Sequence, residues 1–346
     1  MKRFLLRHLG NMGDLVFFIP PVLAGLKKNY PGCHITFVTA WGFKDRRGRW
    51  GALNSHGYSI HLLITNPHID SLIHWHDTKT SLAARICRQD GRRFPTWSAR
   101  YYQQQKNSGN FDAAFELDFG LSVNDNPVQR MLETVGLPID TEPTYRLYFT
   151  DEDVAIAKAV IDGAPRPRIV LLEGLAGRST RGWDPGKIPV LIKAITARYG
   201  APPLWFGGQY IPDYRGRPLT LRQNIAILQH CDVGVGVLSG PLHFAAAAGL
   251  PTITLYGAQP IHRAAPAYFL NDALTDPRSR HRTLLGPTGP TLHFLKSSAP
   301  DENLTPAELR QQKFTVWTSP GKQSTKSCVA AITVDEIMLI LQDMLP

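Results

Sequence analysis

The first forty residues constrain the fold most strongly, because strand, glycine turn, helix and strand signals follow one another there. An apolar run at 4–9 and an alternating β-branched run at 34–39 are typical of buried strands. Between them, residues 10–14 form a glycine-containing turn, and 15–29 carries the apolar spacing of a helix. A strand–helix–strand unit of this length predicts a parallel sheet.

The same alternation returns in the second half of the chain, after a Pro- and Gly-rich linker at 162–167. Pro-, Ser- and Thr-rich residues 275–325 are predicted to be dominated by loops, and 334–345 is predicted to be a helix. The predicted strands of this half are 168–172, 203–206, 233–237 and 252–256, and the predicted helices are 185–199, 219–229 and 241–248.

A chain of 346 residues is long enough for two domains. We therefore predict an α/β protein made of two Rossmann-like, doubly wound parallel-sheet domains that face a cleft. The N-terminal domain is expected at 1–163 and the C-terminal domain at 164–333. Residues 334–346 would be a closing helix that could pack back on the N-terminal domain.

The excess of basic residues indicates which classes of binding partner to expect. Lys and Arg together number 38 against 28 for Asp and Glu, a formal net charge of +10, which favours phosphorylated sugars, nucleic acid or an acidic membrane surface. A solvated surface with no specific anion is the alternative. The basic residues are dispersed and no nucleic-acid-binding motif is present, so nucleic acid is not expected. No apolar run reaches the ~18 residues of a membrane span, and four scattered cysteines without a CxxC pair favour a reducing, cytoplasmic location.

In doubly wound sheets ligands bind beyond the carboxyl ends of the strands, so the turns after the strands are the candidate sites. In the first turn, Gly10, Asn11 and Gly13 would let the backbone approach a phosphate or an acceptor. Asp14 follows them, and two roles are open for it. It could be a general base that takes a proton from a sugar hydroxyl, or it could simply stabilise the helix dipole.

A second candidate turn follows the strand at 233–237. Ser239, Gly240 and Pro241 open a helix there, and the N–H groups of such a helix start suit a phosphate or sugar hydroxyls. His243 lies in the first turn of the same helix and could face the ligand or serve as a structural histidine.

Two further turns carry candidates. Arg178 and Arg181 follow the strand at 168–172 and could clamp a diphosphate, with a solvated basic loop as the alternative. Gly257 follows the strand at 252–256, where an ordinary surface turn would look the same. The sequence has no Walker A or HExxH motif, and Glu116-Leu117-Asp118 is the nearest approach to a DxD signature. We therefore expect no metal and no cofactor.

These turns, in this order, resemble glycosyltransferase family 9, the ADP-heptose:lipopolysaccharide heptosyltransferases. The resemblance spans nearly the whole chain and is weakest between about 40 and 165. The matching segments are Gly13-Asp14, Tyr30-Pro31-Gly32, Arg181-Gly182-Trp183, Gly207-Gly208, Arg217-Pro218-Leu219-Thr220-Leu221, Ser239-Gly240-Pro241-Leu242-His243, Tyr256-Gly257 and Ile332-Thr333-Val334-Asp335-Glu336-Ile337.

The resemblance implies a GT-B architecture and an inverting, metal-independent sugar transfer. It implies that Asp14 is the catalytic base and that Arg181 binds the donor diphosphate. Ser239, Gly240 and His243 would line the pocket of the donor, an ADP-linked sugar by family default. The acceptor would be a lipopolysaccharide core or another cell-envelope glycan, reached by peripheral contact with anionic lipid at the inner face of the cytoplasmic membrane.

One departure from the family pattern stands beside the donor turn, where many members have Asp or Asn before the Ser-Gly-Pro segment and this chain has Leu238. Two other readings therefore stay open. One is a different GT-B enzyme, an epimerase or a phosphorylase. The other is a catalytically degenerate protein that kept the fold and binds a nucleotide or a glycan without transferring a sugar.

Overall fold

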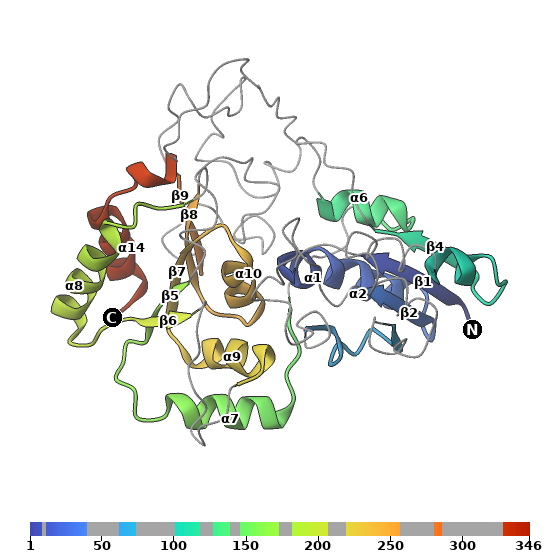
Figure 1. Cartoon of the computed structure of the whole chain (residues 1–346), viewed down its shortest axis with the longest axis horizontal. Helices are drawn as coiled ribbons and strands as arrows, with labels where there is room; N and C mark the ends of the chain where they lie inside the picture. The colour runs from blue at the N-terminus through green and yellow to red at the C-terminus, as the bar shows by residue number, and fades with distance from the viewer. Residues whose placement is uncertain are drawn as a thin grey trace, which may run out of the picture. The chain divides into compact units, whose positions relative to one another are not determined.

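The computed structural model (Figure 1) divides the chain into two compact units, which we describe separately. Unit 1 comprises Met1–Gly120, Pro127–Thr150 and Thr220–Arg222, and unit 2 comprises Leu121–Asn126, Asp151–Leu219 and Gln223–Pro346. The structure describes residues 1–8, 12–39, 62–73, 101–117, 127–138, 146–172, 182–206, 219–256, 280–285 and 328–346.

Unit 1 is built on a parallel sheet whose described strands run in the order β3-β2-β1-β4. Strand β1 (Arg3–His8) pairs in parallel with β2 (His34–Thr39) over its whole length, so the predicted strand–helix–strand unit is confirmed. Strand β4 (Ala113–Glu116) flanks β1 on its other side, and β3 (Ser71–Ile73) flanks β2.

The connection between β1 and β2 differs from the single helix predicted at 15–29. Helix α1 (Met12–Phe17) ends before Phe18, and helix α2 (Ile19–Asn29) begins with Pro20 and Pro21 in its first turn. A proline lacks the N–H that would continue the α1 ladder, and it is tolerated in a first turn where that N–H has no partner. The two prolines therefore make the second helix start afresh.

One face of this sheet carries Leu5 of β1 and Val38 of β2 under Tyr102, which belongs to the helical residues 101–106. Helix α2 packs against helix α6 (Pro127–Thr134). The carboxyl end of β1 is buried as well, at Arg7 and His8.

Unit 2 contains a second parallel sheet, whose described strands run in the order β6-β5-β7-β8-β9. Most strands and helices of this unit match the prediction to within two residues. The strands are β5 (Ile169–Leu172), β6 (Leu204–Phe206), β7 (Val233–Val237), β8 (Thr252–Tyr256) and β9 (His281–Leu285), and the helices are α7 (Asp151–Ile161), α8 (Lys187–Tyr199), α9 (Leu221–Ile227), η3 (Leu228–His230), α10 (Gly240–Ala247), η4 (Cys328–Ala331) and α14 (Val334–Met344).

Helices cover both faces of this sheet (Figure 1). On one face, Leu191 of α8 and Leu341 of α14 share a buried cluster with Leu171, Val235 and other strand residues. On the opposite face, α10 contacts β7 and β8. Apolar side chains on both sides of a parallel sheet define the doubly wound layer order that the alternating pattern predicted.

Strand β9 was missed by the sequence analysis, which assigned 275–325 to loops. Its sequence is polar, and its burial depends on partners far away in the chain. His281 Nδ1 lies 2.9 Å from the hydroxyl oxygen of Thr252 on β8, and Arg282 donates to Asp343 of α14 at 3.3 Å. A local pattern cannot reveal such long-range satisfaction of polar groups.

Residues 151–172 belong to unit 2 by their contacts, and the domain boundary after residue 163 stays a prediction. Helix α7 packs against η3 of unit 2, and Arg168 donates to the carbonyls of Ala164 and His230, each at 3.1 Å. Tyr148, by contrast, accepts a hydrogen bond from Thr65 of unit 1 at 2.6 Å. The Pro- and Gly-rich stretch at 162–167 is therefore a turn inside unit 2. Helix α14 packs within unit 2, against α8.

An aspartate that precedes a strand closes the same pair of hydrogen bonds at three places in the two sheets. In each case the Asp N–H donates to the carbonyl of a residue at or just before the start of the neighbouring strand, and the Asp carboxylate accepts from the N–H of that same residue at 2.6 Å. The pairs are Asp112 with Arg3, Asp70 with Ile35, and Asp232 with Arg168.

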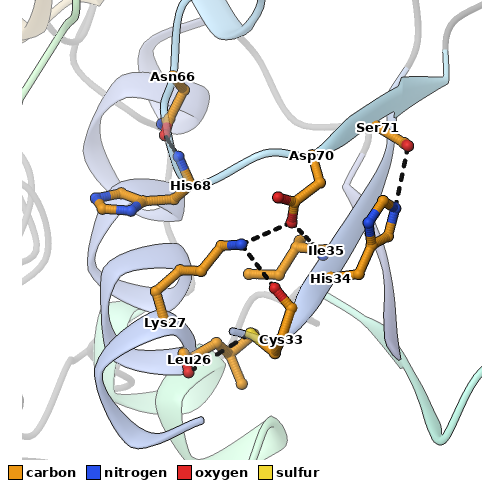
Figure 2. Close-up of polar contacts among 9 residues, drawn as sticks. All are labelled: Leu26, Lys27, Cys33, His34, Ile35, Asn66, His68, Asp70 and Ser71. Carbon is orange, nitrogen blue, oxygen red and sulfur yellow. Dashed lines mark hydrogen bonds and ion pairs between the residues drawn. The ribbon is translucent and has the colours of Figure 1, made fainter. Parts of the chain in front are cut away.

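Figure 2 shows the Asp70 example at the amino end of the unit 1 sheet. Lys27 of α2 donates to Asp70 Oδ2 and to the carbonyl of Cys33, both at 2.7 Å. Close by, His34 Nε2 lies 3.1 Å from the hydroxyl oxygen of Ser71. Although partial burial opposes it, the bonds from Lys27 and from the Ile35 N–H lower the pKa of Asp70. This cluster ties α2, β2 and β3 together at the end of the sheet opposite the predicted site turns.

Candidate functional site

The unit 2 sheet brings the ends of three strands, each followed in sequence by a predicted site turn, to one edge. Strands β5, β7 and β8 are adjacent and parallel, so their carboxyl ends, at Leu172, Val237 and Tyr256, lie side by side. In the sequence, residues 173–181, 238–239 and 257 onward follow those ends. This is the edge at which doubly wound sheets bind ligands.

The start of α10 is the best-described part of this edge. Ser239 is the N-cap residue in an extended conformation (φ −156°, ψ 170°), and Gly240 and Pro241 follow as the first helical positions. The Ser239 hydroxyl accepts no hydrogen bond from the first turn of its own helix. A helix start of this kind presents N–H groups and a positive dipole end, which suit a phosphate or sugar oxygens.

The residues around that helix start are largely buried. His243 and Leu238 are each 8% exposed, and the His243 N–H donates to the Ser239 carbonyl at 3.2 Å. Leu238 therefore supplies apolar surface at the position directly before Ser239.

The remaining predicted donor residues lie outside the described residues. These are Arg178 and Arg181 after β5, and Gly257 after β8. The chain just beyond Arg181 is described, and it is firmly held. The indole N–H of Trp183 donates to the Ile332 carbonyl at 2.9 Å, and Lys187 Nζ donates to the same carbonyl at 2.9 Å and to that of Ala330 at 2.6 Å. Trp183 itself is buried in the unit 2 core.

In unit 1, the structure places Gly13 and Asp14 in the first turn of α1, directly beyond the carboxyl end of β1. Gly13 is buried, while the side chain of Asp14 is not among the described features. Gly10 and Asn11 lie outside the described residues. Asp14 thus lies in a helix that follows β1, where a turn was predicted, and its role stays a prediction.

Sequence reasoning missed a group of polar residues at this same edge. Arg7 and His8, the last two residues of β1, are both buried, and Arg7 forms an ion pair with Glu116, the last residue of β4. His8 Nδ1 lies 3.2 Å from the Leu117 carbonyl oxygen. The available signal was an Arg-His pair directly after the apolar residues 4–6 of the strand, since buried parallel strands are usually apolar throughout.

Among the described residues, no three His, Cys, Asp or Glu side chains converge as metal ligands would. No helix in the described part of the chain is long and apolar enough to cross a membrane. The expected absence of a metal stays a prediction.

Comparison with known proteins bears on this edge directly. The family model described as glycosyltransferase family 9 (heptosyltransferase) matches residues 217–278, which include β7, α10 and β8. A search of curated protein sequences found no match.

Solved structures match over nearly the whole chain. A glycosyltransferase family 9 protein from Veillonella parvula has a TM-score of 0.61 at 16% identity, with 99% of this chain and 97% of that chain covered. The ADP-heptose lps heptosyltransferase II of E. coli gives 0.54 at 12% identity, covering 99% and 98%. The E. coli heptosyltransferase WaaC with ADP gives 0.54 at 13% identity, covering 99% of each chain. At these identities the likeness is one of fold.

The two parallel α/β units, with this match over the whole chain, show the GT-B fold of these glycosyltransferases. The similarity to the glycosyltransferase family 9 model lies in the segment that carries the α10 edge.

Proposed function

We propose that this chain is an inverting, metal-independent transferase that moves a sugar from a nucleotide-sugar donor to a cell-envelope glycan, with heptose as the sugar by family default. Unit 2 would hold the donor and unit 1 the acceptor. The observation that carries the proposal is the extended Ser239 at the start of α10, at the carboxyl end of β7 and inside the segment matched by the family model.

The donor diphosphate needs positive charge, because its leaving oxygen gains negative charge as the sugar departs. The helix start at Ser239, Gly240 and Pro241 would supply N–H groups and the dipole of α10. Arg178 and Arg181, which follow β5, would supply guanidinium groups that bind phosphate oxygens in pairs. Gly257 would let the backbone after β8 approach the donor, and His243 would line the pocket.

The acceptor hydroxyl needs a base. We assign that role to Asp14, with Gly10, Asn11 and Gly13 shaping the turn around it. As the acceptor oxygen forms a bond to the anomeric carbon, the bond from that carbon to the diphosphate breaks and the carboxylate of Asp14 takes the hydroxyl proton. One displacement from the face opposite the leaving group inverts the configuration at that carbon.

The nucleotide is proposed to be ADP and the acceptor a lipopolysaccharide core or similar glycan. Two related structures support this choice through their names, one an ADP-heptose lps heptosyltransferase and the other a heptosyltransferase with ADP. The net charge of +10 fits docking on a phosphorylated glycan or on anionic lipid at the inner face of the cytoplasmic membrane, with the protein in the cytoplasm.

Calorimetric titration of the purified chain with ADP, UDP, GDP and CMP at one salt concentration tests the donor assignment. We expect ADP to bind most tightly. Preference for another nucleotide would keep the transferase and discard the ADP-linked donor. Failure to bind any of these nucleotides would contradict the assignment of a donor site to unit 2.

A second candidate function is a protein of the same fold that binds a nucleotide or glycan without transfer. Leu238 favours it, because an apolar, largely buried side chain precedes Ser239 where the resemblance leads one to expect Asp or Asn. Binding of ADP without any sugar turnover would select this candidate.

A further inference from the structure

The ion pair between Arg7 and Glu116 lies at the carboxyl edge of the unit 1 sheet, where β1 and β4 end. The two residues are directly opposite each other in the β1–β4 register. The Arg7 side chain is 5% exposed, whereas that of Glu116 is 43% exposed. The cation of the pair is therefore buried, whereas its carboxylate is partly exposed to solvent.

Burial of Arg7 is costly, and stability alone gives a poor account of it. On the same face of the sheet, Leu5, Val38 and Tyr102 form a buried apolar cluster, and Val38 is the register partner of Arg7 on β2. The Arg7 charge is close enough to lower the pKa of the Tyr102 hydroxyl, while burial raises that pKa more. An apolar side chain at position 7 would continue this cluster at no electrostatic cost, because a buried ion pair is at best weakly stabilising.

The ion pair does orient the carboxylate of Glu116. The buried Arg7 guanidinium holds the Glu116 carboxylate in place through the ion pair. A fixed and partly exposed carboxylate can accept hydrogen bonds from hydroxyl groups. It repels phosphate, because the exposed partner of the pair is the negative one.

We propose that Glu116 is a binding residue for the hydroxyl groups of the acceptor sugar, and that Arg7 is its positioning residue. This inference rests on the proposed function for the kind of ligand, a polyhydroxylated glycan. It adds a group outside the predicted Gly10–Asp14 turn, on the neighbouring strand end of the same sheet.

The test compares the full chain with its Glu116→Gln variant in binding a deacylated inner-core oligosaccharide of lipopolysaccharide, measured by calorimetry. Gln keeps the shape of Glu and loses the charge. Glu133→Gln, an exposed carboxylate on α6, is the matched control. ADP affinity and thermal unfolding are measured on all three proteins.

We expect Glu116→Gln to weaken oligosaccharide binding by about tenfold, the effect of one charge-assisted hydrogen bond. ADP affinity should be unchanged, and Glu133→Gln should match the parent chain in both. Arg7→Lys, which keeps the buried charge and loses the planar fork, should weaken oligosaccharide binding to a smaller extent.

Three results would overturn the proposal. One is unchanged oligosaccharide affinity in Glu116→Gln, with or without a lower unfolding temperature, since that would make the pair structural. Another is an equal loss in Glu133→Gln. The third is an absence of oligosaccharide binding by the parent chain. If instead the parent chain binds oligosaccharide through Glu116 but does not bind ADP, the proposed donor function fails while this inference stands.

Discussion

A Cβ atom placed on Gly236 would lie 2.8 Å from the Cβ atom of Leu172 and 3.3 Å from its carbonyl oxygen. The two residues are register partners on β7 and β5, one residue before the end of β7 and at the end of β5. The absence of a side chain at position 236 thus lets the two strands that carry the proposed donor edge pack closely.

Gly236→Ala should therefore lower the free energy of unfolding by about 1–3 kcal/mol, because neither a Cβ atom nor a backbone oxygen can rotate away from the overlap. Urea unfolding followed by circular dichroism measures the change.

Gly240→Ala is the matched comparison, because its added Cβ would meet the Phe244 ring only at 3.9 Å, an ordinary contact. Its stability should stay within about 0.5 kcal/mol of the parent chain. An equal loss in both variants would contradict the packing argument.

Asp70→Ala should destabilise the chain by about 1–3 kcal/mol, because the Ile35 N–H and Lys27 each lose an acceptor (Figure 2). Asp70→Asn should cost less, since an amide oxygen can still accept from the Ile35 N–H. The pKa of Asp70 is lowered in the folded chain. Its contribution is therefore present above the unfolded pKa of about 4 and is lost as the pH falls through the folded pKa. Equal stability of the Ala and Asn variants would argue against the paired hydrogen bonds.

His281 should make the chain sensitive to acid. Burial, with the charge of Arg280, lowers the pKa of His281 to about 3. In the unfolded chain His281 has a pKa of about 6.5, so below that pH the unfolded chain binds a proton that the folded chain does not bind. The free energy of unfolding therefore falls by up to about 1.4 kcal/mol per pH unit until the pH nears 3. His281→Asn, which retains a polar partner for Thr252, should flatten the stability profile between pH 6.5 and 4. An unchanged slope in chemical unfolding across that range would count against this role.

The regular parts of both sheets could be predicted from the sequence, because their signals are local. Strands β2, β7 and β8 are runs of apolar and β-branched residues or glycine between clear turns, and their predicted bounds match the structure. Strand β9 could not be predicted, since His281 and Arg282 are accommodated by Thr252 and Asp343 from distant segments.

The candidate site residues also fall into those that a local pattern marks and those that it does not. Glycine turns and helix starts mark Gly13, Asp14 and Ser239 in the sequence, and the structure places them where strands end. The pairing of Arg7 with Glu116 depends on which strand lies beside β1. A separation of more than a hundred residues hides that neighbour from any local pattern.

Arg181→Ala should weaken ADP binding by roughly tenfold or more if its guanidinium binds the diphosphate, since charge-assisted hydrogen bonds are among the stronger ones. Arg198→Ala, on the last turn of α8, is the control and should bind ADP like the parent chain. Calorimetry measures both. Unchanged affinity in Arg181→Ala would remove this residue from the donor site.

The most direct test of the central claim is the release of ADP from ADP-heptose by the parent chain and by Asp14→Asn, in the presence of a chelator and a core-truncated lipopolysaccharide. We expect the parent chain to release ADP in step with the attachment of sugar to the lipopolysaccharide, without added metal. Asp14→Asn should lose at least about a hundredfold in rate, the contribution of a general base, while keeping its fold and its ADP affinity. Near-normal turnover by Asp14→Asn would remove Asp14 from the mechanism, and no transfer by the parent chain from ADP-heptose or any other nucleotide sugar would contradict the claim that this chain is a sugar transferase.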